Sequence, residues 1–254
     1  MGKLLNLLSV MTVLATALHA PLVAAADGKG AVLAGGLVTP TPIWEHVLYE
    51  DLKQEGGTYS FYKVTVGARY FTGDEQLVIR VIADSFDSDP DVYISSSNKN
   101  PKSSDDEGVL WYCETQGSET CILHTGEFDL GQDIYIGVKC VRDCSYKLKT
   151  QYVEIEALKD TTRTQKRFGA YETHILSYYI APDKAGAWTD SIEMKVEPEE
   201  PYTNIEVYLS LDANFKVIDE KRAEHVLRNG LAIKFGKNDF DWCSKCYVYL
   251  IVNV

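Results

Sequence analysis

The sequence predicts an all-β protein made of two tandem antiparallel β-sandwiches, and three features of the chain support this fold class. Short segments rich in Val, Ile, Tyr and Thr alternate between apolar and polar residues, as half-buried strands do. Helical periodicity is nearly absent, and only residues 219–230 look helical. One pattern of strands also occurs twice. In its first copy the expected strands are "YSFYKVTV", "EQLVIRVIA", "PDVYIS", "DIYIGVKC" and "CSYKLKTQYVEI".

The first 26 residues have the features of a signal peptide. Lys3 precedes an apolar run from Leu4 to about Leu18, and the alanines at 24–26 fit cleavage before Asp27. The alternative is an uncleaved membrane anchor, but the run is shorter than the roughly 20 residues that span a bilayer. We therefore expect a secreted or extracellular protein, or one in the secretory-pathway lumen, with no integral membrane span in this chain.

Six cysteines are expected to form disulfides, because an oxidising compartment favours pairing and an even count leaves none over. Their short spacings predict pairing between neighbours, with the first two pairs closing β-hairpins. The predicted pairs are Cys113 with Cys121, Cys140 with Cys144, and Cys243 with Cys246. For the last pair, a redox motif or half a zinc site is the alternative, but no further ligands or βαβ setting accompany it.

The repeat divides the mature chain into two units. "LVIRV" at 77–81 reappears as "IEMKV" at 192–196, and "DVYIS" at 91–95 reappears as "EVYLS" at 206–210. Two further matches, starting at Tyr59 and Tyr171 and at Phe128 and Phe240, occur in the same order. The predicted organisation is a signal peptide (1–26), an N-terminal segment with a first strand (27–56), β-sandwich 1 (57–155), a linker (156–168) and β-sandwich 2 (169–254).

The strand motifs resemble the bacterial prepeptidase C-terminal domain and its relatives in extracellular and protist surface proteins. The resemblance rests on an acidic strand start, a "YIGV" strand and a closing "YKL" strand. The matching residues are Asp89, Asp91, Val92, Tyr93 and Ile94, then Tyr135, Ile136, Gly137 and Val138, then Tyr146, Lys147 and Leu148. It implies a jelly-roll-like β-sandwich that serves binding, targeting or stability without catalysis. Some members bind calcium near the acidic strand start.

The second unit departs from this pattern. Asn204 and Glu206 stand at the two aspartate positions, so the acidic pair is weakened. No counterpart of "CSYKLKTQY" follows the last strand before Val254, and we therefore expect the second sandwich to be one strand short. Either the natural chain continues, or a partner or the N-terminal segment supplies that strand.

The stretch "DSFDSDPDVYIS" at 84–95 is the candidate metal site. Its four aspartates, Asp84, Asp87, Asp89 and Asp91, are of the ligand type that calcium prefers. The spacing is not that of an EF-hand, because Val92 stands where the loop needs glycine. The alternative is a solvated acidic loop, which is common in a chain whose formal charge is -12.

No catalytic residues are predicted, because the chain contains no recognised catalytic or phosphate-binding motif. The negative charge argues against nucleic acid as a partner. Sixteen tyrosines and four tryptophans leave a carbohydrate site open, with "WYC" at 111–113 as a candidate exposed aromatic edge. We therefore expect a non-catalytic binding or adhesion module for an unidentified protein or carbohydrate, with calcium as candidate cofactor. The alternative is the accessory part of a larger secreted hydrolase or membrane protein that continues beyond residue 254.

Overall fold

The computed structural model describes residues 38–68, 71–158, 168–180, 191–195, 205–212, 225–228, 232–236 and 246–254. The predicted signal peptide, Cys243 and most of the predicted linker lie outside these residues. The described part is all β-structure, with no helix. It accordingly holds no helix of the length and apolar character that crossing a membrane requires.

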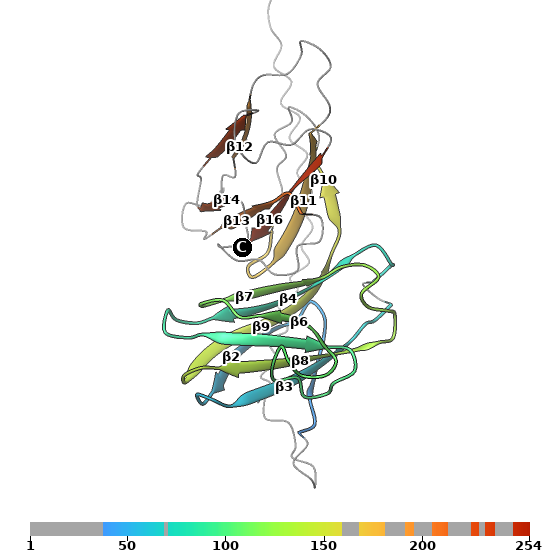
Figure 1. The fold of residues 1–254 in the computed structure, drawn as a ribbon, viewed down its shortest axis with the longest axis vertical. Coiled ribbons are helices and arrows are strands. Elements are labelled where there is room, and N and C mark those ends of the chain that lie inside the picture. The colour runs from blue at the N-terminus through green and yellow to red at the C-terminus, as the bar shows by residue number, and fades with distance from the viewer. Residues whose placement is uncertain are drawn as a thin grey trace, which may run out of the picture.

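The first unit consists of two packed sheets (Figure 1). The five-stranded sheet has the order β1 (Thr41–Ile43), β3 (Tyr59–Thr65), β8 (Asp133–Cys140), β5 (Pro90–Ser95) and β6 (Val109–Cys113). The four-stranded sheet has the order β2 (Leu48–Gln54), β9 (Cys144–Val153), β4 (Gln76–Ala83) and β7 (Glu119–Leu123). Alternate residues of these strands, such as Val64, Ile94 and Ile136 in one sheet and Leu77 and Ile79 in the other, meet in one buried core.

The second unit repeats the strand order of the first. Its larger sheet runs β10 (Ile155–Ala157), β11 (Thr173–Ile180), β16 (Cys246–Asn253), β13 (Glu206–Ser210) and β14 (His225–Arg228). β12 (Ser191–Lys195) pairs with β15 (Ala232–Gly236), as β4 pairs with β7 in the first unit. The edge strands β1 and β10 each pair in parallel with their neighbour, and the other pairings are antiparallel. The sequence repeat is therefore confirmed by equivalent topology.

Two details of the sequence interpretation are wrong. Within the helical-looking segment 219–230, the described residues 225–228 form strand β14 and pair with β13. Pairing with a neighbouring strand here outweighs local helix propensity. Neither of the first two disulfides closes a hairpin, because each joins strands that belong to different sheets: β6 to β7, and β8 to β9. They therefore connect the two layers of the sandwich.

The disulfides themselves are confirmed for the first two predicted pairs, Cys113 with Cys121 and Cys140 with Cys144. Cys246 is also disulfide-bonded. Its predicted partner, Cys243, lies outside the described residues. Such bonds are compatible with an extracellular or secreted protein.

The two units pack through the outer faces of two sheets, as Figure 1 shows for the strands around β4, β7, β11 and β16. The apolar contact joins strands β4, β7 and β9 of the first unit to β11, β13 and β16 of the second. Its buried residues are Val78, Ile122 and Val153 on one side and Ile175, Tyr208 and Ile251 on the other. This separate apolar layer orients the second unit on the first.

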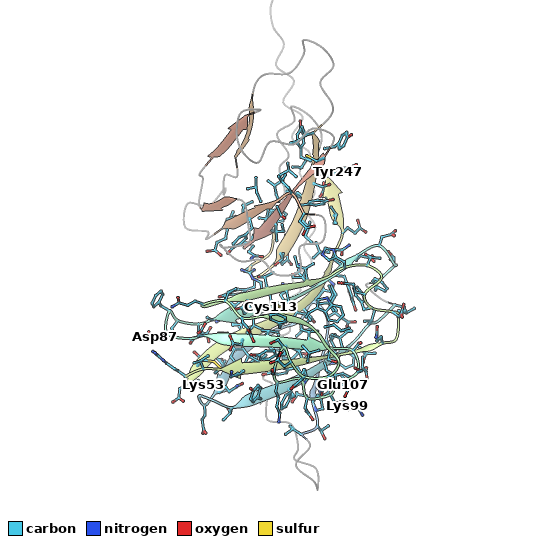
Figure 2. The ribbon with its side chains drawn as sticks, viewed as in Figure 1. Lys53, Asp87, Lys99, Glu107, Cys113 and Tyr247 are labelled. Atoms are coloured by element: carbon cyan, nitrogen blue, oxygen red, sulfur yellow. A yellow bond between two sulfur atoms is a disulfide. The ribbon has the colours of Figure 1, made fainter. Side chains whose placement is uncertain are left out.

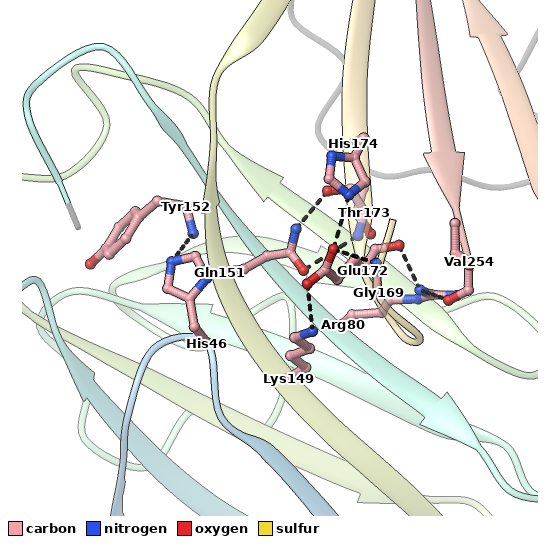
Figure 3. A network of polar contacts seen from close by, with 10 residues as sticks. All are labelled: His46, Arg80, Lys149, Gln151, Tyr152, Gly169, Glu172, Thr173, His174 and Val254. Carbon is pink, nitrogen blue, oxygen red and sulfur yellow. Dashed lines mark hydrogen bonds and ion pairs between the residues drawn. The ribbon is translucent and has the colours of Figure 1, made fainter. Parts of the chain in front are cut away.

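Hydrogen bonds also join the two units (Figure 3). The guanidinium of Arg80 donates from Nη1 to the carbonyl oxygens of Glu172, at 3.2 Å, and of Val254, at 2.9 Å. The side-chain amide of Gln151 donates to the carbonyl of Thr173 and accepts from its N–H. The contact between the units is therefore polar as well as apolar, and its buried polar groups depend on partners in the opposite unit.

Candidate functional site

A loop across the five-stranded sheet builds the candidate site. Residues 96–108, which connect β5 to β6 and are called the strap below, pass over the outer face of β8. Pro101 of the strap lies so close to Gly137 that a Cβ atom at Gly137 would overlap the Pro101 carbonyl. Glycine in β8 is therefore what allows the strap to lie against the sheet.

Short-range hydrogen bonds hold the strap in shape. The Ser95 hydroxyl donates to the carbonyl of Gly108, which ties the end of the strap to its beginning, and accepts the Asn98 N–H at 2.8 Å. The Asn98 side chain accepts the Asn100 N–H at 3.0 Å, and the Asn100 amide donates to the carbonyl of Val38 at 2.8 Å. Serine and asparagine side chains commonly stabilise turns in this way, and here they fix the walls of a hollow.

An open groove of about 750 Å³ lies between the strap, Phe61 of β3 and Val38. We call it the strap groove. The Lys102 ammonium is 5.9 Å from the ring centroid of Tyr59 and 6.0 Å from that of Phe61, and these two rings are parallel within 3°. Figure 2 shows Lys99 and Glu107 on the same side of the first unit, both at this groove. Its size falls within the range of small-molecule sites, roughly 300–1,000 Å³.

The charges that line the groove are balanced. Lys99 and Lys102 supply two ammonium groups, and Asp106 and Glu107 supply two carboxylates. Lys99, Lys102 and Glu107 are exposed, so that hydrogen-bond donors and acceptors both reach the groove. A balanced set favours a neutral ligand with many hydroxyl or amide groups over an anion or a cation.

The structure places the four predicted metal ligands in different surroundings. Asp84 forms an ion pair with Lys147, and Asp87 is exposed. Asp89 accepts the N–H of Gly117 at 2.8 Å. In the described part of the chain no group of three or more His, Cys, Asp or Glu side chains is arranged to hold a metal ion.

Asp89 and Asp91 interact instead with two glutamates that sequence reasoning did not single out. Glu114, Glu119 and the two aspartates influence one another electrostatically, and we call these four residues the acidic cluster. Burial raises the pKa of Asp91 to about 6, and repulsion from Asp89 and Glu114 adds to this while Lys139 opposes it. The cluster thus gathers acidic side chains where β5 begins and β6 ends.

Glu119 is the buried member of the acidic cluster. It is fully buried, and its Oε1 atom accepts the N–H of Thr115 and its hydroxyl group, the latter at 2.8 Å. Its Oε2 atom is buried without a hydrogen-bond partner. Burial raises the pKa of Glu119 to about 8, Thr115 partly offsets this, and the charges of Asp91 and Asp89 reinforce it. The alternation of residues in β7, "ETCIL", could have predicted that Glu119 lies on the inward face with Cys121 and Leu123.

Calcium binding by Asp84, Asp87, Asp89 and Asp91 stays a prediction. Calorimetric titration of calcium into chelator-treated protein tests it. Saturable heat that is lost in the Asp89→Asn/Asp91→Asn variant would support a cation site. Absence of heat would leave a solvated acidic loop.

Comparisons with known proteins identify no family for this chain. The sequence matches no known protein family and no curated protein. A solved structure, dimeric latent PorU from Porphyromonas gingivalis, aligns over 90% of this chain at 8% identity, with a TM-score of 0.22. The chain spans 22% of the PorU structure. At this low similarity, PorU carries no argument about fold or function.

Proposed function

We propose that this protein is a non-catalytic binding or adhesion module, secreted or at the cell surface, and that the strap groove is its ligand site. The groove carries the proposal because it combines a fixed loop, an aromatic wall and exposed groups of both charges. The disulfides that connect the two sheets keep the sheet beneath it in place.

The ligand class that suits the groove best is a neutral, polyhydroxylated molecule such as an oligosaccharide. Hydroxyl groups both donate and accept hydrogen bonds, and Lys99 and Glu107 offer one partner of each kind. The half-buried ring of Tyr59, stacked on the buried ring of Phe61, offers apolar surface to the C–H face of a sugar once the flexible Lys102 side chain moves aside.

A glycan array tests this function. We expect the protein to bind a subset of neutral glycans, and the Lys99→Met variant to lose most of that binding while remaining folded. Lys53→Met is the matched control, because Lys53 is also exposed and Figure 2 places it at the opposite side of the first unit. Failure to bind any glycan, or equal binding by both variants, would contradict the proposal.

A further inference from the structure

The first unit has four edge strands, and three of them are poor templates for another strand. β1 is three residues long and contains Pro42. β2 has a register shift between Tyr49 and Leu52 and carries charged residues, and every residue of β7 is buried. Short length, proline, bulges and charge all discourage further pairing. β6 has no proline and no charged residue, and its one register shift lies at its beginning, beside Val109.

β6 presents apolar side chains at an open edge. Within the described part of the chain, its sheet ends at β6, with β5 as its neighbour. Leu110 is 57% exposed and Tyr112 is 42% exposed, on the same face of the strand. Its sequence, "VLWYC", has no charge and no proline. An exposed apolar edge of this kind pairs readily with an extended segment of another chain.

The edge is held rigidly. Pairing between β5 and β6 is regular from Trp111 to Cys113, and the register shift lies at the other end, between Ile94 and Ser95. The disulfide from Cys113 to Cys121 ties the end of β6 to the facing sheet. A partner strand would therefore meet a preorganised surface, which lowers the entropic cost of binding.

Negative charge flanks this apolar edge at both ends. Glu107 is exposed just before β6, and Asp105 is exposed two residues earlier. Glu114 is exposed just after β6, where the rest of the acidic cluster also lies. Asp89, which accepts the N–H of Gly117, adds a second carboxylate at that end. Cationic side chains of a partner would relieve this repulsion.

We propose that β6 binds an extended basic peptide segment of a partner protein as an added strand. Apolar side chains of the peptide would contact Leu110 and Tyr112. Lysine or arginine residues at its two ends would contact Glu107 and the acidic cluster. A second copy of this chain suits the edge less well, because it would bring the same carboxylates against one another. The inference goes beyond the proposed function. Glu107 belongs to both surfaces, whereas Leu110, Tyr112 and the acidic cluster lie outside the strap groove.

Binding of a synthetic peptide, measured by fluorescence anisotropy, tests the inference. The probe is fluorescein-labelled Lys-Lys-Thr-Val-Thr-Val-Thr-Lys-Lys, which alternates as a strand and is basic at both ends. One comparison peptide replaces the lysines with glutamates, and another replaces the central threonine with proline, which cannot donate the strand hydrogen bond. We expect saturable binding of the first peptide, weakened by salt, and little binding of the other two.

Protein variants locate the binding surface. Leu110→Thr/Tyr112→Thr keeps β-propensity but removes the apolar contacts, and we expect it to weaken binding by about tenfold or more. Glu114→Gln should weaken binding and reduce its salt dependence. Tyr179→Thr is the matched control, because Tyr179 is also 42% exposed but lies in the second unit. Lys99→Met should leave peptide binding unchanged, which separates this surface from the strap groove.

Three results would each overturn the inference. The first is equal binding of the proline-containing peptide. The second is unchanged peptide binding by Leu110→Thr/Tyr112→Thr, with circular dichroism showing that the variant is folded. The third is a concentration-dependent dimer in sedimentation velocity that this variant abolishes, because the edge would then belong to a second copy of the chain.

Discussion

Replacing Glu119 with glutamine should make the protein more stable at neutral and alkaline pH. The Glu119 carboxyl is fully buried, and burial raises its pKa to about 8. In an unfolded chain a glutamate ionises near pH 4.5. Between these two values the folded protein binds more protons than the unfolded chain, so its stability falls as pH rises. Glutamine keeps the oxygen that accepts from Thr115 but cannot ionise.

The magnitude follows from the difference between the two pKa values. Each pKa unit corresponds to about 1.4 kcal/mol, so a difference of roughly three and a half units corresponds to about 5 kcal/mol when Glu119 is fully ionised. The difference in unfolding free energy between Glu119→Gln and wild type should grow with pH from about pH 5 and level off near pH 9. Comparing the two proteins removes the smaller contribution of Asp91, which titrates in both.

Urea denaturation followed by tryptophan fluorescence, repeated across this pH range, measures the effect. Glu75→Gln is the matched control. Glu75 is also buried, but hydrogen bonds from the backbone and side chain of Thr72 outweigh its burial and lower its pKa. Its contribution is lost only as pH falls below about 4.5, so this control should run parallel to wild type from pH 5 to pH 9. A parallel curve for Glu119→Gln would refute the reasoning.

Three further results are expected. Gly137→Ala places a methyl group against the backbone of the strap, so we expect the unfolding free energy from urea denaturation to fall by about 1–3 kcal/mol and ligand binding in the groove to weaken. Unchanged stability would mean that the strap does not lie on β8. Arg80→Met removes two hydrogen bonds between the units, including one to Val254, so it should lower the unfolding temperature and separate the calorimetric transition into two. A single transition at the wild-type temperature would contradict this contact. The hydrogen bond with His174 lowers the pKa of Glu172 to about 2, so the stabilisation from Glu172 should be lost as pH falls from about 4.5 towards 2. Acid titration of Glu172→Gln should therefore show a smaller loss of stability than that of wild type, and equal losses would exclude this role of Glu172.

The strand content and the repeat could be predicted from the sequence because both depend on local pattern. "DVYIS" and "EVYLS" alternate in the same way and form equivalent strands, β5 and β13. Alternation cannot tell which sheet a strand joins, so both disulfides were wrongly expected in hairpins. Likewise, the helical-looking residues 225–228 became a strand because β13 offered them a partner.

The strap groove could not be predicted, because its geometry depends on residues distant in the sequence. Nothing local to Gly137 indicates that Pro101 lies against it. The interaction of Asp89 and Asp91 with Glu114 and Glu119 likewise depends on how β5, β6 and β7 meet at one end of the sandwich. Proximity in the sequence instead suggested that Asp84 and Asp87 would lie beside Asp89 and Asp91. In the structure Asp84 forms an ion pair with Lys147.

Hydrogen–deuterium exchange, with and without a neutral oligosaccharide that the protein binds on the array, tests the proposed ligand site most directly. We expect the ligand to slow exchange in residues 96–108 and in the segment of β3 around Phe61, and to leave β6 and the second unit unchanged. Protection confined to another surface, with none in the strap, would contradict the proposal that the strap groove is where this protein binds its ligand.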